Sequence, residues 1–178
     1  MALKSAIFKV DLDISNIDHN HYSQHNLTIA RHPSETDLRM MLRVVVFACH
    51  ASDTIQFTKG LCSSDEPDLW QKNMNDDIEL WIELGQPDEK RIRKACSRAK
   101  NVIVYCYSTK SAAVWWKQAE SKFSRYKNLT VRHIPEYQAE LLATWVNRSM
   151  CIHAVIQDGV LTLTNENHVA DIVYEMWK

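Results

Sequence analysis

Glycine is scarce in this chain of 178 residues, which contains only Gly60, Gly85 and Gly159. A backbone loop that cradles a phosphate needs several glycines close together, as in the G-x-G-x-x-G and G-x-x-x-x-G-K-[ST] motifs. Three widely separated glycines form neither motif. The sequence therefore excludes a Rossmann dinucleotide-binding enzyme and a P-loop nucleoside triphosphatase.

Paired cysteines and long apolar segments are also missing. The 5 cysteines are odd in number and form no C-x-x-C pair, which predicts reduced, buried thiols in a cytoplasmic protein. No run approaches the ~18 to 20 apolar residues of a membrane-spanning helix. Residues 1–14 alternate apolar and polar side chains and lack the hydrophobic region of a signal peptide. We therefore expect a cytoplasmic location and no membrane association; the sequence does not define an oligomeric state.

Strand and helix patterns alternate along the chain and predict a single mixed α/β domain over residues 1–178. A mixed sheet flanked by helices is expected, with antiparallel strands at the N- and C-terminal ends. After residue 78, strands alternate with helices, which indicates right-handed β-α-β crossovers and parallel strands. The expected strands cover residues 6–14, 27–29, 55–60, 78–84, 102–107, 129–134, 150–157, 160–164 and 170–176, and the expected helices cover 34–49, 88–100, 111–123 and 135–146.

The strand expected at 78–84 carries acids on one face. Side chains alternate between the faces of a strand, so Glu79, Trp81 and Glu83 share a face. A carboxylate late in a strand, such as Glu83, is a natural ligand for Mg²⁺, which takes hard oxygen ligands. Spacing alone favours the alternative, in which Glu79 and Glu83 lie on a solvated face.

Further acids precede this strand. The cluster Asp65, Glu66 and Asp68 lies a hairpin's length before it, so a neighbouring strand can bring Asp68 beside Glu83. A solvated acidic loop is the alternative. Glu35 is expected in the first turn of the helix that begins at 34, where an acid complements the helix dipole even without any other role.

A basic helix is predicted directly after the same strand. Lys90 and Arg91 fall in or just after its first turn, where cations oppose the helix dipole by roughly 0.3 to 1 kcal/mol each. Arg91, Lys94 and Arg98 form a stripe away from the apolar positions. An acidic pocket beside a basic flank suits a metal ion and a phosphodiester. A solvated charged face is the alternative.

Six strings of residues stand out beyond these patterns. They are A-R-H-P-S-E-T at 30–36, M-M-L-R at 40–43, Q-F-T-K-G-L-C at 56–62, D-E-P-D-L-W at 65–70, L-W-I-E-L-G-Q-P-D-E at 80–89 and I-Q-D-G-V at 156–160. Together they resemble the YaeQ family of bacterial proteins, and the resemblance extends over essentially the whole chain.

The resemblance implies a compact variation of the PD-(D/E)XK nuclease core, with element order α-β-β-β-α-β between residues 34 and 107. In that superfamily, an acid on a helix, an acid on a strand and a D/E-x-K motif surround a metal ion. By position, the implied metal ligands are Glu35, Asp68 and Glu83, with Mg²⁺ or Mn²⁺ as the cofactor. The motif lysine falls at position 85, where this chain has Gly85.

The missing lysine leads to two functional hypotheses. Lys90, Arg91 and Lys94 are the possible substitutes, and the rise per residue places Lys94 about 9 Å along the helix, so Lys90 or Arg91 reaches back more easily. The first hypothesis is a metal-dependent nuclease or phosphodiesterase, in which the three acids hold the metal and one of these basic residues acts on the phosphate. The second is a non-catalytic module that retains the fold and binds nucleic acid or a protein.

Overall fold

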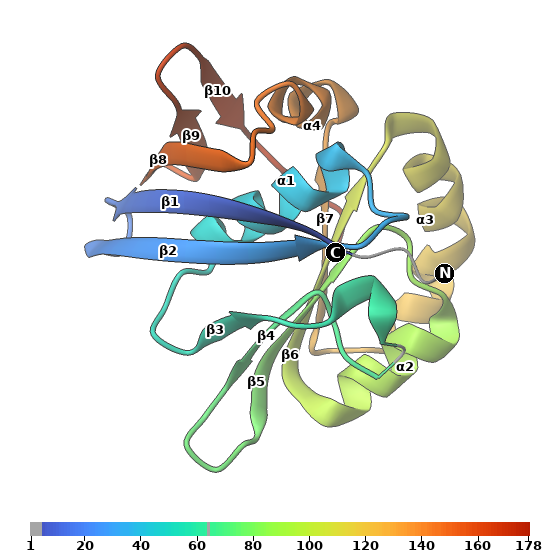
Figure 1. Cartoon of the computed structure of the whole chain (residues 1–178). Helices are drawn as coiled ribbons and strands as arrows, with labels where there is room; N and C mark the ends of the chain where they lie inside the picture. Colours follow the sequence, from blue (N-terminus) through green and yellow to red (C-terminus); the bar gives the residue numbers. More distant parts are fainter. Residues whose placement is uncertain (1–4, 64) are drawn as a thin grey trace. The chain divides into compact units, whose positions relative to one another are not determined.

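The strands and helices form two compact units (Figure 1). The computed structural model describes residues 5–63 and 65–178. One unit contains residues 5–51 and 137–173, and the other contains 52–136 and 174–178. Each contains a mixed sheet and helices, so the predicted mixed α/β class is confirmed, with the strands divided between two sheets. That the chain forms a single domain over residues 1–178 stays a prediction.

The first unit is built on a sheet of order β10-β9-β8-β1-β2. β1 pairs antiparallel with β2, and β8 with β9, as the hairpin patterns predict. The antiparallel strands expected at the two ends of the chain are thus confirmed, and the two hairpins are joined by β1 and β8, which run parallel. Alternation shows which side chains are buried but not the direction of the neighbouring strand. The strands are β1 (Ala6–Asn16), β2 (His21–Arg31), β8 (Ser149–Gln157), β9 (Val160–Thr164) and β10 (Val169–Ile172).

Helices α1 (Asp37–Cys49) and α4 (Glu136–Ala143) accompany this sheet. α1 packs on β2, where the rings of Phe47 and His25 meet edge to face with centroids 5.0 Å apart. The predicted start of this helix at Ser34 is wrong, because Thr36 is the N-cap and its hydroxyl accepts from the Arg39 N–H at 3.2 Å. Glu35 therefore precedes the helix instead of lying in its first turn.

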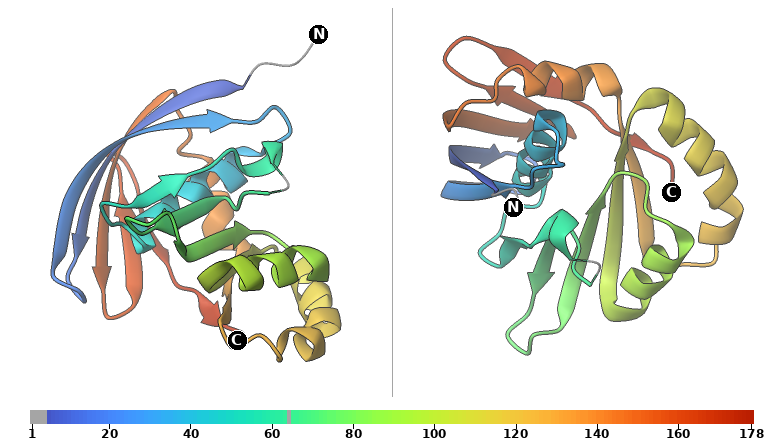
Figure 2. Two further views of the ribbon diagram at one scale, coloured as in Figure 1. Left: turned by 90° about the horizontal axis from the view of Figure 1, so that it is seen from below. Right: turned by 45° about the vertical axis from the view of Figure 1, so that its right-hand side comes forward.

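The second unit is built on a sheet of order β11-β7-β6-β5-β4-β3. β5, β6 and β7 are parallel, as predicted, and β4 is antiparallel to β5. Helices α2 (Glu89–Arg98) and α3 (Thr109–Phe123) lie together on one face of this sheet, over a core that includes Trp81, Ile92 and Phe123 (Figure 2). The strands are β3 (Ile55–Phe57), β4 (Leu69–Lys72), β5 (Ile78–Leu84), β6 (Ala99–Tyr107), β7 (Leu129–Ile134) and β11 (Glu175–Met176), and a 3₁₀ turn covers Gly60–Cys62.

The last predicted strand, over 170–176, is broken in two. β10 belongs to the first sheet, and β11 pairs with β7 in the second. Alternation continues across Val173 and Tyr174, but an alternating pattern cannot show that a strand changes its hydrogen-bonding partner.

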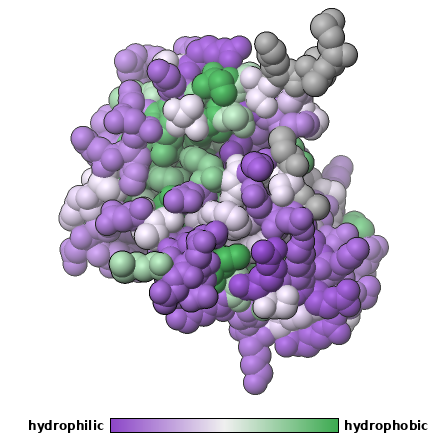
Figure 3. All heavy atoms as spheres, turned by 60° about the horizontal axis from the view of Figure 1, so that its bottom comes forward, coloured by the Kyte–Doolittle hydropathy of each residue, from purple (hydrophilic) through white to green (hydrophobic). Residues whose placement is uncertain are grey.

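Cys49, Cys96, Cys106 and Cys151 are free thiols, although their predicted burial is only partly correct, and the side chain of Cys62 lies outside the described part of the structure. Cys106 is buried, Cys49 and Cys96 are half-buried, and Cys151 is exposed. Within residues 5–63 and 65–178, no helix is long and apolar enough to cross a membrane. Hydrophilic residues cover most of the face shown in Figure 3, and the hydrophobic ones gather in a smaller area.

Candidate functional site

Asp68 and Glu83 come together where β4 pairs with β5. Leu69 is paired with Ile82, the Asp68 N–H donates to the Ile82 carbonyl at 3.0 Å, and the Leu84 N–H donates to Asp68 Oδ2 at 2.8 Å. Asp68 is 1% exposed and Glu83 is 3% exposed. The solvated alternatives for these two acids are therefore wrong.

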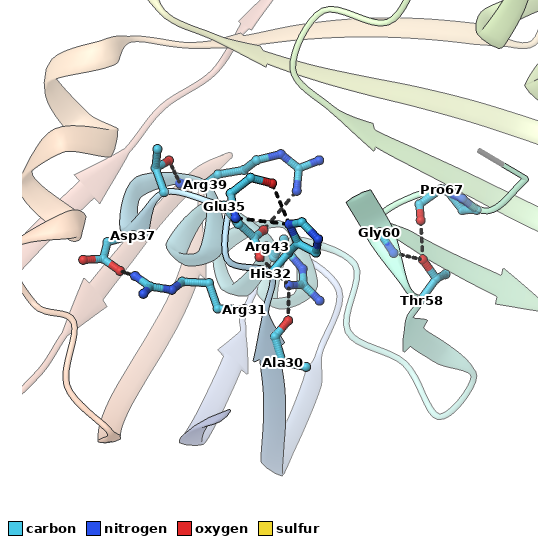
Figure 4. A network of polar contacts seen from close by, with 12 residues as sticks. Ala30, Arg31, His32, Glu35, Asp37, Arg39, Arg43, Thr58, Gly60 and Pro67 are labelled. Carbon is cyan, nitrogen blue, oxygen red and sulfur yellow. Dashed lines mark hydrogen bonds and ion pairs between the residues drawn. The ribbon is translucent and has the colours of Figure 1, made fainter. Parts of the chain in front are cut away.

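Thr58, the first residue after β3, holds the backbone of Asp68 and of Pro67 before it. The Thr58 N–H donates to the Asp68 carbonyl at 3.2 Å, and the Thr58 hydroxyl donates to the Pro67 carbonyl. The same hydroxyl accepts from the Gly60 N–H at 3.0 Å (Figure 4). A Cβ atom at Gly60 would lie 3.4 Å from Asp68 Oδ1, so the backbone passes close to this carboxylate. Asp68 is thus held from both its main chain and its side chain.

The carboxylate of Glu83 accepts two side-chain hydrogen bonds at one oxygen. Trp81 Nε1 and Arg91 Nε each lie 2.8 Å from Glu83 Oε1. Trp81 and Glu83 share a face of β5, as the alternation predicts. Burial raises the pKa of Glu83, and the negative charge of Asp68 acts in the same direction, while Arg91 and the Trp81 indole oppose the rise.

Arg91 is positioned by the start of α2. Asp88 is the N-cap of this helix, and its side chain accepts from the Arg91 N–H at 2.7 Å. The guanidinium of Arg91 also donates through Nη2 to the Glu66 carbonyl at 2.7 Å. Three anchored groups, namely the backbone, Nε and Nη2, therefore fix the orientation of this side chain toward Glu83.

The other two predicted basic residues do not reach Glu83. Lys94 Nζ pairs with Asp65, and this contact lowers the pKa of the Asp65 carboxyl, while Lys90 is exposed to solvent. The Glu66 carbonyl is a partner that the sequence analysis missed, because a backbone acceptor in a loop has no side-chain signal.

Comparison with known proteins identifies the family of this chain over nearly its whole length. The family model described as "YaeQ protein" matches residues 1–174. The chain belongs to the YaeQ family. Two relatives, each called "Uncharacterized protein YaeQ", come from Escherichia coli (strain K12) and Salmonella typhi. Each is 40% identical over 178 residues, covering 100% of this chain and 98% of the relative.

Solved structures of YaeQ proteins have the same fold. The crystal structure of the YaeQ protein from Xanthomonas axonopodis pv. citri matches with a TM-score of 0.94 and 37% identity, covering 98% of both chains. That of the YaeQ protein from Pseudomonas syringae matches with a TM-score of 0.94 and 29% identity, covering 98% of this chain and 96% of the other.

Position 85 of this YaeQ family member has a backbone that favours glycine. Gly85 has φ +102°, a conformation that side chains disfavour, and its N–H donates to the Tyr105 carbonyl at 2.9 Å. A Cβ atom there would meet nothing within 4 Å. Conformation, and not lack of space, therefore disfavours a lysine at this position.

Glu35 lies in the first unit, bound by two arginines of α1. Arg39 Nη1 donates to Oε1 at 3.0 Å, and Arg43 Nη1 donates to Oε2 at 3.1 Å and to the Ala30 carbonyl at 3.3 Å (Figure 4). Glu35 is 5% exposed. The alternative in which Glu35 only complements the dipole of α1 from its first turn is therefore wrong, since the carboxylate precedes the helix and is paired on both oxygens. Metal ligation by Glu35 stays a prediction.

The donor chemistry of Asp68 and Glu83 fits Mg²⁺ or Mn²⁺. Mg²⁺ is commonly held by one or two carboxylates together with waters and substrate phosphates. Arg91 competes for Glu83, since its Nε donates to one carboxylate oxygen. In the part of the chain that the structure describes, no cluster of three or more His, Cys, Asp or Glu side chains is arranged to hold a metal.

Proposed function

We propose that this protein is a metal-dependent phosphodiesterase acting on nucleic acid, with a modified PD-(D/E)XK site. The observation that carries the proposal is the pair of buried carboxylates, Asp68 and Glu83, with the Arg91 guanidinium held against Glu83. Elements α1, β3, β4, β5, α2 and β6 follow the α-β-β-β-α-β order of that superfamily, which supports the assignment. We also propose a cytoplasmic location, because Cys49, Cys96, Cys106 and Cys151 are free thiols.

In this proposal, the two carboxylates bind the metal ion and Arg91 contacts the phosphate. Asp68 and Glu83 would hold Mg²⁺ or Mn²⁺, and the bound ion would supply Lewis acidity toward the phosphate and its attacking water. Arg91 takes the place of the missing lysine, because its guanidinium is always charged and donates in the fork geometry that suits phosphate oxygens. The raised pKa of Glu83 favours its protonated form, so ligation by Glu83 improves as the pH rises.

The experiment is cleavage of single- and double-stranded DNA and RNA with Mg²⁺, with Mn²⁺ and with EDTA. We expect Asp68→Asn and Glu83→Gln each to lower the rate by about 100-fold or more, the loss typical of removing an electrostatic group from an active site. Lys90→Ala, an exposed cation on the same helix, is the matched control and should retain activity. Cleavage that persists in both carboxylate variants would contradict the proposal. Glu35→Gln tests the third predicted ligand separately.

A non-catalytic nucleic-acid-binding module is the second candidate. The direct contact of Arg91 with Glu83 favours it, because the guanidinium already neutralises the carboxylate, and so does Gly85 at the lysine position. This function predicts binding of oligonucleotides in EDTA that weakens steeply with salt and survives in the Asp68→Asn/Glu83→Gln double variant. Binding that requires a divalent ion and both carboxylates would contradict it.

A further inference from the structure

The basic stripe of α2 is occupied by the chain itself. Residues 65 and 66, which precede β4, lie beside this helix (Figure 1). Arg91 Nη2 donates to the Glu66 carbonyl at 2.7 Å. Arg98 Nη1 donates to the Asp65 carbonyl at 3.3 Å, and Lys94 Nζ pairs with the Asp65 carboxylate. All three basic residues of the stripe therefore bind two consecutive residues of one loop.

The acceptors on the stripe are of the kind that a phosphate backbone provides. They are two carbonyl oxygens and one carboxylate, and each meets a different cation. The hydrogen bond and charge of Lys94 hold the pKa of the Asp65 carboxyl below its ordinary value, and the charges of Arg98 and Arg91 act in the same direction. Guanidinium and ammonium groups bind phosphate oxygens with the same donors. A nucleic acid carries a negative charge on every phosphate, so it offers the stripe more charge than the loop does.

The Glu66 carbonyl occupies a donor of Arg91 that suits a phosphate oxygen. Arg91 Nε donates to Glu83 at 2.8 Å, and its Nη2 donates to the Glu66 carbonyl. A phosphate oxygen in place of this carbonyl would receive the Nη2 donor without breaking the contact between Arg91 and Glu83. The loop therefore covers the arm of Arg91 that points away from the carboxylate pair.

Exposed contacts hold Asp65 and Glu66 to α2. The side chain of Asp65 is 72% exposed and that of Lys94 is 36% exposed, and ion pairs at such sites contribute little to stability. Glu66 has one further contact, in which its Oε2 accepts from the Lys59 N–H at 3.2 Å. The next residue, Pro67, is buried. Displacement of residues 65 and 66 from the helix therefore breaks exposed contacts and leaves the buried chain at Pro67 in place.

We propose that the stripe of Arg91, Lys94 and Arg98 binds the phosphate backbone of nucleic acid, and that residues 65 and 66 occupy the stripe in the free protein and are displaced on binding. This inference rests on the nucleic-acid partner of the proposed function, and it applies to the phosphodiesterase and to the non-catalytic module alike. Asp65 is then a competitor of the phosphates, so loss of its carboxylate should strengthen binding.

The first experiment measures binding of a fluorescent oligonucleotide to the full chain in EDTA, by anisotropy at several salt concentrations. We expect Asp65→Asn to bind about 2- to 5-fold more tightly than wild type, the equivalent of one exposed ion pair. Asp53→Asn makes the same change in net charge at an exposed acid before β3, and this matched control should remain close to wild type.

The same titration tests the stripe itself. Lys94→Ala should weaken binding and lower the slope of log affinity against log salt by about 1, as expected for the loss of one phosphate contact. Lys90→Ala, an exposed cation on the same helix and outside the stripe, should leave the slope unchanged.

The second experiment uses a carbodiimide, which joins a carboxylate to a neighbouring amine through an amide bond, in buffer without metal or EDTA. In the free protein we expect cross-links between Asp65 and Lys94 and between Asp76 and Lys72, because both pairs are in contact. Mass spectrometry measures the yield of each. A bound oligonucleotide without terminal phosphates should suppress the cross-link at Asp65 and leave the one at Asp76 unchanged.

Two outcomes would overturn this inference and leave the proposed function intact. One is equal affinity of Asp65→Asn and Asp53→Asn, and the other is a cross-link between Asp65 and Lys94 whose yield does not change when the oligonucleotide is bound. Oligonucleotides that bind none of these proteins, with or without a divalent ion, would overturn both.

Discussion

Glu83 is a buried carboxylate, and its hydrogen bonds reduce the free-energy cost of removing it from water. Transfer of a carboxylate out of water is unfavourable unless it is paired and hydrogen-bonded. The Trp81 indole and the Arg91 guanidinium supply two hydrogen bonds, yet the pKa of Glu83 remains raised because burial outweighs them. A carboxyl that is difficult to ionise and lies beside a second carboxylate is more typical of a functional site than of a surface ion pair.

We expect Glu83→Gln to alter how stability depends on pH. The folded pKa of Glu83 lies above its ordinary value of 4.5, so its contribution to stability is complete below 4.5 and is lost as the pH rises through the folded pKa. Glutamine retains the acceptor for Trp81 and Arg91 but does not ionise. The free energy of unfolding of the variant, relative to wild type, should therefore increase between about pH 4 and pH 8.

The measurement is urea unfolding of both proteins across that pH range. Glu79→Gln, a half-exposed acid on the same face of β5, is the control for the loss of one negative charge. A relative stability of Glu83→Gln that decreases with rising pH would show that pairing outweighs burial at this carboxyl.

At the scale of elements, the predicted basic helix is α2, and it follows the acidic strand β5 directly in the chain. β5 ends at Leu84, Gly85 turns the chain, and Asp88 begins α2 as its N-cap. The N-cap and the site share Arg91, whose N–H is bound by Asp88 and whose guanidinium is bound by Glu83. The start of the helix and the position of the guanidinium are therefore coupled through one residue.

Removal of this cap should lower the free energy of unfolding. We expect Asp88→Ala to cost about 1 kcal/mol, the usual loss when a helix N-cap acceptor is removed. Asp88→Asn is the matched control, since its side-chain oxygen still accepts from the Arg91 N–H, and it should remain close to wild type. Chemical denaturation measures both values. Equal losses in the two variants would point to the charge of Asp88 instead of its capping role.

At the scale of the whole molecule, the chain passes between the two units three times, after residues 51, 136 and 173. Each unit is therefore built from two separate segments of chain, and neither can be cut out as one continuous fragment. This threading favours unfolding of the chain as one cooperative transition, as the single-domain prediction requires.

Fluorine-labelled tryptophan separates the two units in one experiment. Trp145 lies in the first unit, whereas Trp70, Trp81, Trp115, Trp116 and Trp177 lie in the second. We expect the ¹⁹F resonances of both groups to change at the same urea concentration. Midpoints that differ between Trp145 and the other tryptophans would show two domains that unfold independently.

The sequence by itself determined much of the second unit. The run from Ile78 to Arg98 was predicted as a strand, a turn and a basic helix, and β5 and α2 follow that order. The β-α-β alternation predicted the parallel strands β5, β6 and β7. The length of a hairpin allowed Asp68 to lie beside Glu83, with a solvated acidic loop as the alternative, because pairing between consecutive strands depends on short-range spacing that a sequence contains.

Only the tertiary structure decided which polar groups are buried and which partners they meet. Spacing favoured a solvated Glu83 and preferred Lys90 or Arg91 to Lys94 without separating the first two, whereas in the structure Glu83 is buried and its basic partner is Arg91. The division of strands between two sheets and the contact of residues 65 and 66 with α2 were likewise beyond the sequence patterns. These features depend on contacts between residues far apart in the chain, and periodicity records only which side of an element faces inward, not what it faces.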